Sequence, residues 1–144
     1  MKPNRLLCAL ALVCLAGTAT VYALRSGLSV ATAPPVVVET TPRAGAVDVD
    51  PSLAEVRVTF SKDMMTDNMW SVVKISDDTF PKLTGEVHYQ DARIFVIPVA
   101  LEPGSTYALW LNYKQNDAFR DVNGSSSIPY FLVFQTREQR HGRR

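Results

Sequence analysis

The sequence predicts an all-β fold, a seven-stranded immunoglobulin-like sandwich with Greek-key connections. Short segments of apolar or alternating residues recur between residues 36 and 136, and turn residues separate them at fairly even spacing. No stretch of this region repeats its apolar residues about every 3.6 positions over the length of an ordinary helix. The chain of 144 residues is long enough for one domain of ordinary size.

Seven segments have the pattern of strands. Alternation is clearest in 54–60, where Val56, Val58 and Phe60 face one way and polar residues face the other. The segment 85–90 is short and polar, which is typical of an edge strand. We therefore predict strands at 36–40, 54–60, 70–76, 85–90, 93–99, 106–112 and 129–136.

Two connections have informative residues. Tyr107 follows a turn at 101–106 and begins the sixth predicted strand, where sandwiches often place a tyrosine whose hydroxyl contacts nearby backbone. The long connection 113–128 contains Asp121-Val122-Asn123-Gly124, which predicts a turn because Asn and Gly accept positive φ angles.

The N-terminal segment predicts export. Lys2 and Arg5 precede an uncharged, mostly apolar run at 6–24, and Arg25 follows it. This pattern is typical of a signal peptide, and we predict residues 1–23 as that peptide, with cleavage after Val21-Tyr22-Ala23. The alternative is an uncleaved anchor, because the run has 19 residues and about 20 apolar residues span a bilayer. Residues 24–34 are predicted as a linker, and residues 35–137 as the domain.

The distribution of charge excludes nucleic acid as a partner. Residues 34–136 carry 8 Lys or Arg against 13 Asp or Glu, whereas both ends of the chain are basic. Binding to phosphates needs a basic face, which an acidic body does not provide. The basic tail 138–144 is predicted to be disordered. A membrane is expected as a partner only through the N-terminal segment, if it is uncleaved.

No residue of the body forms a recognisable catalytic or thiol site. Both cysteines, Cys8 and Cys14, lie in the apolar run, so the body can form neither a disulfide nor a thiolate metal site. The two histidines, His88 and His141, are too few for a triad or a zinc site, and no nucleophile elbow or phosphate loop occurs. We predict no enzyme, no cofactor and no catalytic residue.

Five sequence blocks together carry a family resemblance. The blocks are 35–49, Val56-Arg57-Val58-Thr59-Phe60-Ser61-Lys62-Asp63-Met64, 101–107, 121–124 and Phe134-Gln135-Thr136. They resemble the bacterial Ig-like domains named after the S-layer protein SbsA, occur in that family's order and span about residues 35–137. The resemblance implies an extracellular or envelope β-sandwich without catalytic residues, commonly a repeat or accessory module of a larger surface protein or secreted enzyme.

A small periplasmic metal carrier of the CopC type is the alternative function. Copper carriers of that type have a similar sandwich and use an N-terminal histidine and a histidine that follows a late aspartate. Here the late site is Asp121-Val122-Asn123, and no histidine lies near the predicted mature start. A calcium loop is also disfavoured, because Phe119 takes a position where an oxygen ligand is needed. We therefore predict no metal ligands.

The remaining candidate is an apolar surface on the sixth and seventh strands. The residues opposite their core-facing positions include Trp110, Phe131 and Val133, with Val72 as a neighbour, and also Ala108, Asn112 and Gln135. Apolar residues grouped on a solvent-facing side mark contact sites. The partner would be an unknown envelope or extracellular protein. Alternatively, the connection 113–128 folds back and Phe119, Val122 or Ile128 covers these residues.

Overall fold

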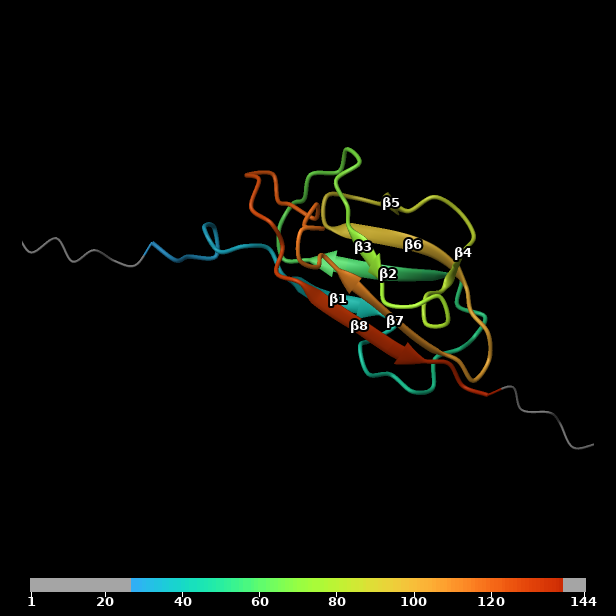
Figure 1. Cartoon of the computed structure of the whole chain (residues 1–144). Helices are drawn as coiled ribbons and strands as arrows, with labels where there is room; N and C mark the ends of the chain where they lie inside the picture. The colour runs from blue at the N-terminus through green and yellow to red at the C-terminus, as the bar shows by residue number, and fades with distance from the viewer. Residues whose placement is uncertain (1–26, 139–144) are drawn as a thin grey trace, which may run out of the picture.

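Two antiparallel sheets make up the computed structural model, which describes residues 27–138 (Figure 1). The predicted signal peptide 1–23 and tail residues 139–144 lie outside the described residues. The eight strands are β1 (Val37–Thr41), β2 (Glu55–Phe60), β3 (Val72–Lys74), β4 (Lys82–Leu83), β5 (His88–Tyr89), β6 (Ile94–Ala100), β7 (Thr106–Leu111) and β8 (Tyr130–Gln135).

The order of the strands confirms the predicted fold class. One sheet has the order β1-β2-β6-β4, with β5 also paired to β6, and the other has the order β3-β7-β8. This is the arrangement of a constant-type immunoglobulin sandwich, with four strand positions in one sheet and three in the other. Within residues 27–138, no helix is long and apolar enough to cross a membrane.

The strands β4 and β5 together form one interrupted edge strand. Leu83 is opposite Val99 on β6, and His88 is opposite Val96, so that residues 84–87 lie against only two residues of β6. Pro98 lies at this point: its carbonyl accepts the N–H of Thr84 at 3.1 Å, but it has no N–H of its own to donate. The fourth predicted strand, 85–90, therefore has wrong bounds, and the strand count is seven when the two halves are taken as one.

The core lies between the sheets and is built from the alternating positions of the central strands. Val56, Val58 and Phe60 of β2 are buried, and the residues between them are half-buried, as the sequence predicted. Phe119 from the connection 113–128 is also fully buried, with its ring centroid 4.9 Å from that of Phe95. Burial of each such side chain contributes about 1.5–3 kcal/mol.

The predicted tyrosine corner is present at the start of β7. The Glu102 N–H donates to the hydroxyl oxygen of Tyr107 at 2.7 Å, and the Tyr107 ring is buried beside Phe134. Thr136, just after β8, joins the same turn, because its hydroxyl donates to the Glu102 carbonyl at 2.5 Å and accepts the Ser105 N–H at 2.9 Å. The turn before β7 is thus fastened to the end of β8.

Asn112 organises the connection 113–128, and its predicted place on the outer face is wrong. The residue is 1% exposed and has a φ of 56°, so the chain leaves the strand geometry there and turns the side chain inward. Its Nδ2 donates to the carbonyls of Phe119 and Ser127, both at 3.1 Å, and its Oδ1 accepts the Phe119 N–H at 3.0 Å.

The predicted turn at 121–124 is confirmed, with the Gly124 N–H donating to the Asp121 carbonyl at 2.8 Å.

Candidate interaction surface

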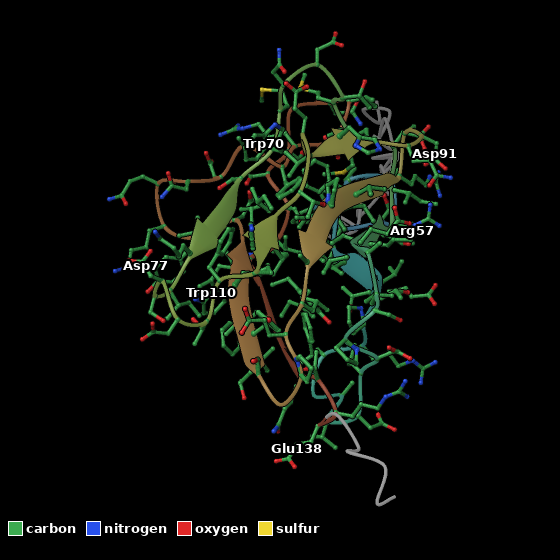
Figure 2. All side chains as sticks on the ribbon, turned by 90° about the vertical axis from the view of Figure 1, so that its right-hand side faces the viewer. Arg57, Trp70, Asp77, Asp91, Trp110 and Glu138 are labelled. Carbon is green, nitrogen blue, oxygen red and sulfur yellow. The ribbon has the colours of Figure 1, made fainter. Side chains whose placement is uncertain are left out.

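The outer face of the three-stranded sheet brings the predicted residues Trp110, Phe131 and Val133 together. Trp110 on β7 is directly opposite Phe131 on β8, and Ala108 is opposite Val133. The rings of Trp110 and Phe131 have centroids 4.9 Å apart. Figure 2 shows where Trp110 lies among the side chains. We name Val73, Trp110, Tyr113, Phe131 and Val133 the aromatic face.

Val73, and not Val72, is the β3 residue of the aromatic face. Val73 is opposite Trp110 in the β3–β7 pairing, whereas Val72 is opposite Leu111 and packs against the core. The predicted strand 70–76 had the right location, but successive residues of a strand point to opposite sides, so the choice of neighbour was wrong by one position.

Tyr113 is a member of the aromatic face that sequence reasoning missed. Its ring stacks on Trp110, with centroids 4.9 Å apart and planes at 24°, and the Lys114 ammonium lies 4.9 Å from the Tyr113 centroid. The left-handed conformation of Asn112 and the reciprocal backbone hydrogen bonds of Tyr113 and Asn116 turn the ring back over the sheet. The one sequence signal for this turn is Asn112, because Asn accepts positive φ angles.

The connection 113–128 leaves Phe131 accessible. Phe131 is 40% exposed, while Trp110 and Val133 are half-buried. Phe119, one of the three residues expected as a cover, is instead buried in the core, and Val122 and Ile128 are themselves 59% and 50% exposed. The aromatic face is therefore open at its β8 side and partly covered by Tyr113 at its β7 side.

The outer face of the other sheet differs in its chemistry. Arg57 on β2 pairs with Glu55 at 2.8 Å between Nε and Oε1, and it also donates to Gln90 beside β5. Glu39, Thr59 and the half-buried Ile94 line the same side, so this surface is more polar than the aromatic face.

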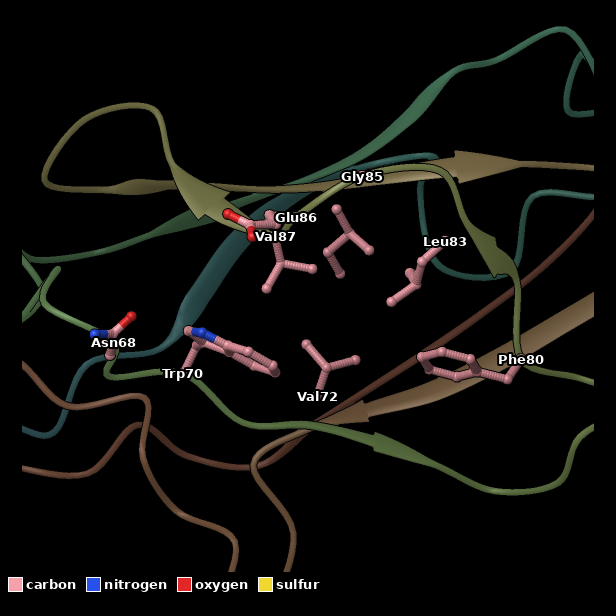
Figure 3. A pocket seen from close by; sticks show the side chains of 9 residues that line it. Asn68, Trp70, Val72, Phe80, Leu83, Gly85, Glu86 and Val87 are labelled. Carbon is pink, nitrogen blue, oxygen red and sulfur yellow. The ribbon is translucent and has the colours of Figure 1, made fainter.

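A second feature, an apolar groove of about 530 Å³, opens between β3 and the β4–β5 edge (Figure 3). Its lining combines Val72 of β3, Leu83 of β4 and Ile97 of β6 with residues of the connecting segments. Trp70 and Leu83, which are 41% and 44% exposed, line it. Sequence reasoning did not find this groove; its other lining residues are Asn68, Phe80, Gly85, Glu86 and Val87.

The carboxylates of the long connection have partners within the chain. Asp117 pairs with Arg120 at 2.5 Å, and Asp121 Oδ1 accepts the N–H groups of Asn123 and Ser125 at 3.0 and 2.9 Å. Among residues 27–138, no group of three His, Cys, Asp or Glu side chains could hold a metal ion. His88 is exposed on β5, with Nδ1 3.1 Å from the Glu86 carbonyl.

Between residues 27 and 138, three ionisable groups have shifted pKa values, each with a local cause. Burial raises the pKa of Tyr89, whose hydroxyl donates to the Met69 carbonyl at 3.1 Å. Hydrogen bonds from Ser52 lower the pKa of Asp50, and the ammonium of Lys74 lowers that of Asp77. None of these groups belongs to the five residues of the aromatic face.

A family model described as bacterial Ig-like domain matches residues 31–136. The chain belongs to the bacterial Ig-like domain family. The match spans every strand of both sheets and all five residues of the aromatic face. It confirms the predicted Ig-like character of the chain, while the narrower SbsA type stays a prediction.

Two solved structures of the S-layer protein SbsC are similar to this Ig-like domain. The structure of rSbsC(31-844) has 17% identity and a TM-score of 0.46, and covers 76% of this chain. The structure of SbsC domains 1–6 has 16% identity, the same TM-score and the same coverage. The chain spans only 14% of each of these structures. No curated protein matches the chain.

Proposed function

We propose that this Ig-like domain is an exported, non-catalytic module that contacts an envelope or extracellular protein through its aromatic face. The observation that supports this most is the opposed pair of the half-buried Trp110 and the exposed Phe131, on a sheet whose counterpart has a more polar outer face. The sequence pattern of residues 1–25 supports export. The five sequence blocks that resemble SbsA-type domains support a structural role at the cell envelope.

The chemistry of the aromatic face fits recognition of another protein. Tryptophan is enriched among the residues that dominate binding energy, and a large flat ring loses little conformational entropy when it is covered. Trp110 is held between Tyr113 and Phe131, with both ring centroids at 4.9 Å, so its position is set before a partner arrives. Such preorganisation reduces the entropic cost of association.

Export and binding need separate tests. Fusion of alkaline phosphatase after residue 138 of the full chain would report export, because that enzyme matures only outside the cytoplasm. We expect activity from the full chain and none from a chain without residues 1–23. Equal activity of both fusions would show that the N-terminal segment does not direct export.

Photo-crosslinking from two positions tests the aromatic face in living cells. A benzophenone residue at position 131 is compared with one at position 59, because Thr59 lies on the polar outer face of the other sheet. We expect a discrete adduct from position 131 that disappears in Trp110→Ser, and no such adduct from position 59. The same adducts from both positions, or insensitivity to Trp110→Ser in a folded variant, would refute the assignment.

A further inference from the structure

The N-terminal linker lies against the end of the sandwich that carries the connection 113–128. The Ile128 N–H donates to the Pro35 carbonyl at 3.0 Å, and the Ser61 N–H donates to the Val36 carbonyl at 2.9 Å. Further upstream, the linker forms a turn in which the Ala33 N–H donates to the Ser29 carbonyl at 2.7 Å. The segment is therefore more ordered than its small residues and prolines suggest.

Lys62 connects this linker turn to the domain. Its ammonium donates to the Ala31 carbonyl at 2.8 Å and to the Ala33 carbonyl, and it lies 3.5 Å from Oδ2 of Asp121. A lysine ammonium has three N–H donors and accepts no hydrogen bond. Two backbone carbonyls of the linker and one carboxylate of the domain thus surround it.

Lys62, Asp121 and the linker carbonyls depend on each other, because the two charged side chains are largely shielded from water. The Lys62 side chain is 14% exposed and that of Asp121 is 1% exposed. Asp121 Oδ2 has no hydrogen-bond donor, while Oδ1 already accepts two backbone N–H groups, so Lys62 supplies the positive charge that the buried carboxylate needs. Without the linker, the ammonium would lose both of its hydrogen-bond acceptors.

We propose that Lys62, held by Asp121, is a positioning residue that clamps linker residues 27–33 onto the sandwich. Residues 27–33 then keep a fixed position on the sandwich and do not act as a flexible tether. This inference does not depend on what the aromatic face binds.

The test measures amide hydrogen exchange of the linker in the full-length chain, in detergent micelles, by mass spectrometry. Lys62→Met keeps most of the side-chain volume but removes the ammonium. We expect exchange in residues 29–33 to accelerate about tenfold or more, because two charge-assisted hydrogen bonds are lost. The matched control is Lys74→Met, which breaks an ion pair with Asp77 between side chains that are 51% and 89% exposed; it should leave linker exchange unchanged.

Unchanged linker exchange in a folded Lys62→Met protein would overturn the proposal. Folding is judged from the exchange of β2 and β7, which should stay as in the wild type. If Lys62→Met does not fold, the wild-type chain gives a second readout through nitrogen NMR of its lysine ammonium groups. We expect slow proton exchange at Lys62 and fast exchange at Lys82, which is exposed on β4; equally fast exchange at both would also overturn the clamp.

Discussion

Replacement of Asn112 by alanine should strongly destabilise the domain. The change removes the two hydrogen bonds that Nδ2 donates to the Phe119 and Ser127 carbonyls and the one that Oδ1 accepts from the Phe119 N–H. The site is 1% exposed, so water does not readily replace these partners. An orphaned buried donor or acceptor costs about 1–3 kcal/mol.

The size of the expected loss of stability depends on which buried groups lose their last hydrogen-bond partner. The Phe119 carbonyl still accepts the Ser127 N–H at 2.8 Å, so the main losses are the Phe119 N–H and the Ser127 carbonyl. A φ of 56° adds about 1 kcal/mol for alanine. We expect a loss of about 3 kcal/mol in the free energy of unfolding, or about 10–15 °C in Tm for a domain of this size.

Thermal and urea unfolding, followed by circular dichroism, would measure this loss. Asn112→Gly separates the two causes, because glycine tolerates the left-handed conformation but restores no hydrogen bond. Asn116→Ala is the control at an exposed asparagine of the same connection and should change the stability by less than about 0.5 kcal/mol. A wild-type stability for Asn112→Gly would refute the argument from hydrogen bonds.

Three further predictions concern the corner, pH and metals. Tyr107→Phe removes the hydrogen bond to the Glu102 N–H and should cost about 1 kcal/mol in urea unfolding; no measurable loss would show the corner to be dispensable. The pKa of Tyr89 is raised above its ordinary value of 10.0 by burial, so its stabilising contribution is complete below pH 10 and is lost as the pH rises further. Tyr89→Phe should flatten that decline, and an identical decline would contradict the assignment. Calorimetric titration with copper(II) and calcium should show no stoichiometric binding, whereas one tight site would favour the metal-carrier alternative.

The predictions from sequence were most accurate where they rested on residues close together in the chain, namely the alternation of apolar and polar residues in strands and the residue types of turns. The period of two in Val56, Val58 and Phe60 predicted their burial correctly, because one face of β2 meets the core. Tyr107 and the turn at 121–124 were predicted from residues only a few positions apart. Trp110, Phe131 and Val133 were placed on one face by the same alternation, and the pairing of β7 with β8 brings them together.

The failures come from contacts between distant segments. Asn112 continued the alternation of its strand in the sequence, but its left-handed backbone ends that pattern. The break between β4 and β5 occurs where residues 84–87 lie beside Pro98 of β6. The alternation of apolar and polar residues does not reveal which strand lies beside this proline. No local pattern predicts the burial of Lys62, because that burial requires linker residues that lie 29 to 31 positions away.

The placement of the two chain ends has a mechanical consequence. The described chain enters the sandwich at one end and leaves it at the other, so tension between the ends acts along the strands (Figure 1). Hydrogen bonds between antiparallel strands lie perpendicular to the strand axes. Tension would therefore load the bonds of β1 with β2, and of β8 with β7, in shear and all together rather than one at a time. A domain strained in this geometry transmits force along its length.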